Sequence, residues 1–235
     1  MKKFLKKYTS FFASLITAMI VFACQKQSLD EKVLEFEDFN FSVPISSLLP
    51  ERMKSKDMDG FYEVKSSTIR KDTAYDNEFS AERKPKWIEY HQMSHSTDTH
   101  LAKFGDFDFN TVNFVTALDG KIMLLNAVDT EITPSESGKF IAAIDKKYGK
   151  AVKTTGDFFG SFDIYTWNLK DRVIKYSVAH DDEKGTLKIE VNAEQGKIKA
   201  GEKKPHSKAY LYIAPNDYAG KIFEDMTTGD LLYCK

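Results

Sequence analysis

An Asp-Gly pair with strand-like segments on both sides places the strongest constraint on how this chain can fold. Val112, Phe114, Thr116 and Leu118 fall at every second position before Asp119-Gly120, and the segment Lys121-Ile122-Met123-Leu124-Leu125 follows at once. An Asp-Gly pair supplies the positive φ angles that a two-residue type I′ turn needs. The sequence therefore predicts an antiparallel β-hairpin here.

The clearest helix signal follows this hairpin, over residues 134–148. Thr133 can cap the helix, Pro134 suits its first position, and Glu136 completes a Thr-x-x-Glu capping box. Gly149 is a residue at which a helix commonly ends. The apolar residues Phe140, Ile141, Ile144 and Tyr148 share one face, so the helix is expected to cover a sheet.

Alternating residues continue beyond the helix, in segments 165–169, 174–178 and 187–191. Three neighbouring strands with one apolar face predict an antiparallel meander backed by the helix, which is an α+β fold. We expect a lysine-rich linker at 197–208, a strand at 210–213 and a last helix at 217–226. Shorter strands are expected at 34–43, with an irregularity, and at 61–64 and 87–90, whereas 66–86 shows little periodicity.

Four lysines lie among the first seven residues, and an uncharged run from Thr9 to Ala23 follows them. A membrane-spanning helix needs about 20 apolar residues, so this run is short for a span. A basic start, a short apolar stretch and small residues before a cut site describe an export signal that is removed. A retained N-terminal anchor helix is the alternative.

Val21-Phe22-Ala23-Cys24 resembles the lipobox of bacterial lipoprotein precursors. The resemblance implies that residues 1–23 are a cleaved signal peptide and that the Cys24 thiol carries a lipid anchor. Two or three acyl chains on one cysteine give lasting attachment, because a single chain binds membranes only marginally. By the sorting habit of that family, Gln25 favours the outer membrane if the cell has one. The expected location is the cell envelope.

Without residues 1–23 the chain has 212 residues, with 30 basic and 35 acidic side chains and a formal charge of −5. This acidic balance argues against nucleic acid as a partner. We expect residues 24–32 to be a polar tether and 33–235 a single domain. A boundary near residue 105 is the alternative, with 44–105 packing as a separate unit.

Cys234 is the only other cysteine. If Cys24 carries lipid, Cys234 has no partner within the chain, and the fold is not a disulfide scaffold. The residues before it, 231–233, are apolar and favour a buried position in a closing strand over an exposed thiol.

Three of the five histidines lie close together, at His91, His95 and His100. Neutral imidazoles bind zinc or copper well, so these three are the candidate metal ligands. The segment lacks the His-Glu-x-x-His pattern, and its serines and threonines disfavour a helix. Solvated loop histidines are the alternative interpretation.

No complete catalytic or cofactor motif accompanies these histidines. Residues 106–110 imitate the start of a calcium loop but lack its later Gly and Glu, and 196–206 lacks the Lys-Ser/Thr end of a phosphate loop. Tyr165 and Trp167 could line a ligand groove, although alternating strand aromatics more often lie in a core. We therefore predict no cofactor.

The sequence favours a lipid-anchored envelope protein that binds an envelope protein or a polysaccharide at the membrane surface, without chemistry of its own. One alternative is an envelope enzyme, such as a metal-assisted hydrolase that uses His91, His95 and His100. A second is an inhibitor or immunity-type lipoprotein with one protein partner, which an exposed apolar patch on the Tyr165/Trp167 strand would favour.

Overall fold

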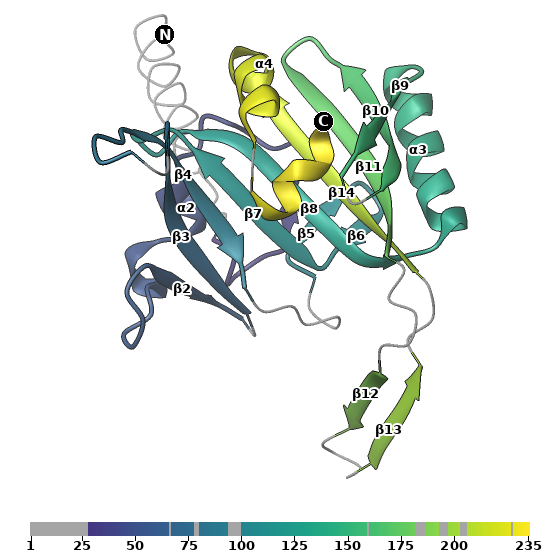
Figure 1. Ribbon diagram of the computed structural model, residues 1–235, viewed down its shortest axis with the longest axis horizontal. Helices are drawn as coiled ribbons and strands as arrows, with labels where there is room; N and C mark the ends of the chain where they lie inside the picture. Colours follow the sequence, from purple (N-terminus) through teal and green to yellow (C-terminus); the bar gives the residue numbers. More distant parts are fainter. Residues whose placement is uncertain are drawn as a thin grey trace, which may run out of the picture.

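The computed structural model describes residues 28–65, 67–77, 80–93, 100–158, 160–181, 187–192, 197–202, 206–226 and 228–235. The expected signal peptide, Cys24 and His95 lie outside them. Nine antiparallel strands form one large sheet (Figure 1), which confirms the predicted α+β class. Their spatial order is β2 (Phe61–Val64), β3 (Ser67–Tyr75), β4 (Pro85–Gln92), β7 (Thr111–Thr116), β8 (Ile122–Ile132), β14 (His206–Pro215), β11 (Arg172–Asp181), β10 (Ser161–Asn168) and β9 (Val152–Asp157).

Two smaller sheets accompany the large one. The first has the order β1 (Leu34–Glu35), β5 (Ala102–Phe104) and β6 (Phe107–Phe109), with β1 parallel to β5. The second pairs β12 (Leu187–Asn192) with β13 (Lys197–Glu202), between β11 and β14 in the chain.

The helices lie on both faces of the large sheet (Figure 1). The longest helix, α3 (Pro134–Tyr148), covers one face, and its predicted capping box at Thr133 and Glu136 is present. The second helix, α4 (Asn216–Asp225), and the C-terminal 3-10 helix η2 (Gly229–Cys234) cover the other face. Two short elements, α2 (Ile45–Leu48) and η1 (Glu51–Met53), lie in the N-terminal part.

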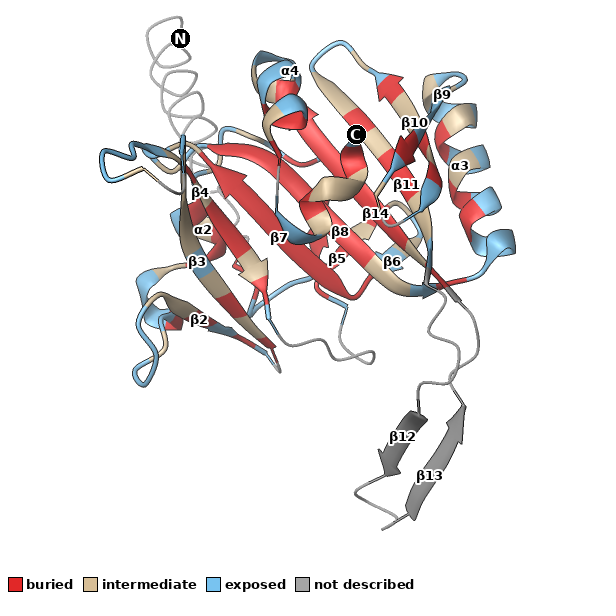
Figure 2. Ribbon diagram, viewed as in Figure 1, coloured by how far each residue is buried: buried red, intermediate tan, exposed pale blue. Residues whose placement is uncertain are grey.

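Strand periodicity divides the core into two layers. On β14, Ala209, Leu211 and Ile213 face the α3 side, whereas Tyr210 and Tyr212 face α4 and η2. The central strands are consequently buried along most of their length (Figure 2). The sequences of these strands are nearly continuous apolar runs, because both faces of the sheet are covered.

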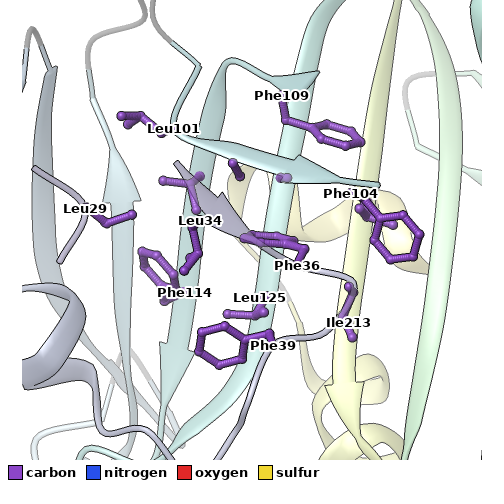
Figure 3. Packing of buried hydrophobic residues seen from close by; sticks show 14 of the residues in the cluster. Leu29, Leu34, Phe36, Phe39, Leu101, Phe104, Phe109, Phe114, Leu125 and Ile213 are labelled. Atoms are coloured by element: carbon purple, nitrogen blue, oxygen red, sulfur yellow. The ribbon is translucent and has the colours of Figure 1, made fainter. Parts of the chain in front are cut away.

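The N-terminal segment packs on the α3 side of the sheet (Figure 3). Leu29, Phe36 and Phe39 are almost fully buried, and the Leu29 N–H donates to the Leu48 carbonyl at 3.1 Å. The prediction of a polar tether over residues 24–32 is therefore corrected: from Ser28 onward, where the described residues begin, the chain is part of the domain. The expected long strand at 34–43 is reduced to β1.

The predicted hairpin is present as β7 and β8, but its turn differs from the expected one. The Gly120 N–H donates to the Ala117 carbonyl, and the Ala117 N–H donates to the Lys121 carbonyl. Within this loop, Gly120 is the one residue with a positive φ, of 87°. This is a three-residue loop with a glycine bulge rather than a type I′ turn. The register of the two strands shifts just before it, between Val115 and Thr116.

The predicted meander is only partly correct. β10 and β11 pair as expected, but the third strand next to them is β14, and β12 pairs with β13 instead. The expected linker 197–208 is wrong, because it contains β13 and the start of β14. Segment 66–86, which shows little periodicity, contains the nine-residue strand β3. Across residue 105 the large sheet is continuous, since β4 pairs with β7.

Candidate functional site

Two of the three candidate metal ligands, His91 and His100, lie within the described residues, and each has an acidic neighbour. The His91 ring nitrogen Nε2 lies 2.8 Å from Glu89 Oε2 on β4, and His100 Nδ1 lies 3.5 Å from Asp108 Oδ2. His95 is outside the described residues. Within the described ranges, no three His, Cys, Asp or Glu side chains are arranged to hold a metal ion. A metal site that includes His95 stays a prediction.

Glu89 is the most buried acidic side chain among the described residues, at 4% exposure. Its carboxylate accepts hydrogen bonds of 2.8 Å from the Trp87 indole N–H and the Thr228 hydroxyl, and lies 2.8 Å from His91 Nε2. Burial acts to raise the pKa of Glu89, but the bonds from His91, Trp87 and Thr228 outweigh it, and the pKa lies below its ordinary value.

Further polar side chains of the same face bind the C-terminal segment, residues 228–235. The Ser177 hydroxyl donates to the Tyr233 carbonyl at 2.7 Å, and Lys175 Nζ donates to the Cys234 carbonyl at 2.8 Å. Tyr212 donates its hydroxyl to the Asp230 carbonyl. These contacts hold residues 228–235 on the sheet, so the groups around Glu89 have a structural role.

Cys234 is buried, as the sequence favours, but it lies in η2 and not in a strand. Burial raises the pKa of its thiol to about 11. The Sγ atom donates to the Leu231 carbonyl at 3.2 Å. A thiol of this kind is an inert part of the core.

The aromatic pair on β10 is divided between core and surface. Trp167 is 2% exposed, and its indole N–H donates to Asp145 Oδ1 at 3.0 Å. Tyr165 is half-buried and lines a depression of about 410 Å³ beside α3. Since Trp167 belongs to the core, the two residues do not form the exposed apolar patch that an inhibitor would favour.

Two large depressions lie at the end of the sheet where the β7–β8 and β10–β11 turns meet the N-terminal segment. One, of about 790 Å³, is bounded by those turns and the start of α4. The other, of about 740 Å³, runs along α2 and η1 to Ser28. The two are adjacent and share one wall, formed by Asn40, Ser42, Val43 and Pro44. We call them together the end groove.

Arg172 builds one wall of the end groove. Its guanidinium donates to the Glu37 carbonyl at 3.2 Å and to Asp171 Oδ2 at 2.8 Å, and it lies 5.3 Å from the centre of the Phe41 ring. The bond from Arg172 holds the pKa of Asp171 below its ordinary value. This one side chain thus joins the β10–β11 turn to the N-terminal segment.

The walls of the end groove combine aromatic rings with charged and hydroxyl groups. They include the rings of Phe41 and Tyr218, the carboxylates of Asp119, Asp171 and Asp217, the cations of Lys121 and Arg172, and the hydroxyls of Ser42, Ser46 and Ser47. Volumes of 300–1,000 Å³ with a few polar groups are usual for ligand sites. Each of the two depressions falls within this range of volumes.

The sequence does not predict this groove, because the groove is formed by four segments that are distant in the chain and none of them carries a motif of its own.

In the described part of the chain, no helix is both long enough and apolar enough to cross a membrane. Comparisons with protein-family models, with curated proteins and with solved structures found no match for this chain.

Proposed function

We propose that this protein is a lipid-anchored protein of the cell envelope that binds a ligand in the end groove. The observation that carries the proposal is the place of Ser28, which lines the groove. It follows Cys24 by four residues, and four extended residues span at most about 14 Å. Lipid on Cys24 would consequently hold the groove close to the membrane surface.

The groove favours a ligand that is extended and rich in hydroxyl or amide groups. Its two depressions are open and adjacent, and their carboxylate, amide and hydroxyl groups can each accept or donate hydrogen bonds. Such a surface suits an envelope polysaccharide or an extended segment of an envelope protein, the two kinds of partner that the sequence analysis names as expectations.

The anchor is tested by replacing Cys24. We expect Cys24→Ala to move nearly all of the protein from the membrane fraction to the soluble fraction, because loss of the acyl chains removes about 0.8 kcal/mol for each buried methylene. The measurement is the distribution of the protein between fractions, with the mass of its N-terminal peptide. An unacylated N-terminal peptide in the unaltered protein would contradict the proposal.

The groove is tested by blocking its shared wall. Ser42 is exposed, so Ser42→Trp can fill the groove without disturbing the core. We expect binding of the lipid-free Cys24→Ala protein to isolated envelopes to weaken about tenfold or more, or about 1.4 kcal/mol. Ser135→Trp, at an exposed position on α3, is the matched control. Equal binding by the two variants would exclude the end groove as the site.

A further inference from the structure

Strand β9 forms an open edge of the large sheet. Among the described strands, β9 pairs with β10 alone. At the opposite edge of the sheet, β2 forms an isolated β-bridge with Lys54 and accepts a backbone hydrogen bond from the Ser55 N–H. Val152 at the start of β9 is 58% exposed, the most exposed large apolar side chain together with Leu118 among the described residues. An edge of this kind presents backbone N–H and C=O groups to another strand.

Lys153 does not protect this edge in the usual way. Lysines on edge strands discourage pairing when their charge is unmatched. Here Lys153 Nζ lies 2.8 Å from Asp163 Oδ2 on the neighbouring strand, and 5.5 Å from the centre of the Tyr165 ring. The lysine is therefore directed along β10, and the edge of β9 stays open to a partner.

We propose that β9 binds β9 of a second copy of this chain, antiparallel and about a two-fold axis at Thr155. In this register Lys153 lies opposite Asp157 of the second copy, so its ammonium, which already contacts Asp163, can bridge both carboxylates, and the two-fold axis makes this contact twice. Val152 lies opposite Phe158 of the second copy, and Thr154 opposite Gly156. Within the described residues Asp157 has no ion pair, so this contact would supply one.

Other registers lose this complementarity. A shift by one position faces Lys153 with Gly156 or with Phe158, and a shift by two positions faces it with Thr155 or with Phe159. Each leaves Asp157 without a cation, and only the shift that faces Lys153 with Phe158 gives Val152 an apolar neighbour, Phe159. The two-fold register about Thr155 is the one in which charge and apolar surface both match, as a symmetric interface requires.

The interface is small, because each copy contributes one six-residue strand. Interfaces of this size are weak and transient in solution. The pairing becomes substantial when both copies are held at a high local concentration. The inference uses neither the end groove nor the lipid anchor, so it stands or fails separately from the proposed function.

Cysteine cross-linking tests the register directly. Facing residues of antiparallel strands have Cα atoms about 4.5–5.5 Å apart, within the range of a disulfide. In lipid-free Cys24→Ala protein, Thr155→Cys should form an intermolecular disulfide under mild oxidation. Thr154→Cys is the matched control on the same strand, since in this register its two copies lie diagonally, about 7–8 Å apart.

We expect about tenfold more disulfide-linked dimer from Thr155→Cys than from Thr154→Cys. Adding Asp157→Lys to Thr155→Cys should reduce the yield, because it places two lysines opposite each other. Equal yields from the two cysteine variants, or no dimer from either, would overturn the inference. Thiol labelling of both variants under reducing conditions establishes that each cysteine is reactive, and the parent protein with buried Cys234 is the blank.

Discussion

Replacing Glu89 with alanine is expected to lower the free energy of unfolding by about 3–5 kcal/mol. The variant leaves the buried Trp87 indole N–H without its acceptor, and also removes the acceptor of the half-buried His91 ring and of the hydroxyl of Thr228, an exposed residue. The unpaired buried N–H costs about 1–3 kcal/mol, and each of the other two lost bonds adds about 0.5–1.5 kcal/mol. Chemical unfolding in urea, followed by tryptophan fluorescence, measures the change.

The matched control is Glu63→Ala, an exposed glutamate on β2 of the same sheet. Its expected effect is within about 0.5 kcal/mol, as for most surface substitutions. A Glu89→Ala variant as stable as Glu63→Ala would show that the contacts of Glu89 contribute little.

Glu89 also predicts a pH dependence of stability. The pKa of its carboxyl is lower in the folded protein than its ordinary value of 4.5. The unfolded chain therefore binds this proton more readily, so the contribution of Glu89 is fully present above pH 4.5 and is lost as the pH falls through the folded pKa. Glu89→Gln should show a smaller loss of stability than the unaltered protein over that acidic range.

The features predicted correctly from the sequence depend on residues close together in the chain. Thr133, Pro134 and Glu136 act within one helical turn, and Gly149 ends the same helix with a φ of 94°. The hairpin strands likewise follow from their own alternation. The detail of the turn does not, because the register shift at Val115 depends on how β7 and β8 pair along their whole length.

The features that were missed depend on contacts between distant residues. β14 lies between β8 and β11 in the sheet, whereas the order of the strands in the chain predicts that β11 pairs with β12, the next strand. The bond between Glu89 and Thr228 spans 139 positions. Arg172 contacts Glu37 across 135 positions. No local pattern encodes such pairs, and for this reason the sequence did not point to the end groove.

Phe140→Ala is expected to lower the free energy of unfolding by about 3–5 kcal/mol, because it leaves a cavity in the core. Phe140 is 1% exposed, and its ring centre lies 4.5 Å from that of Tyr176 on the sheet and 4.9 Å from that of Phe107 on β6. The rings of Phe104 and Phe109 also pack against it. One side chain thus joins α3, the large sheet and the β5–β6 pair.

The position of Phe140 gives this substitution a second expected effect, on the N-terminal segment. β5 pairs with β1 at Leu34, so loosening β5 and β6 should also raise hydrogen exchange in residues 34–37, beside the end groove. Ile141→Ala is the matched control: it alters the next residue of the same helix, which is half-buried, and should cost about 1 kcal/mol. If both variants lose equal stability, or if exchange rises only within α3, then Phe140 does not couple the helix to the N-terminal segment.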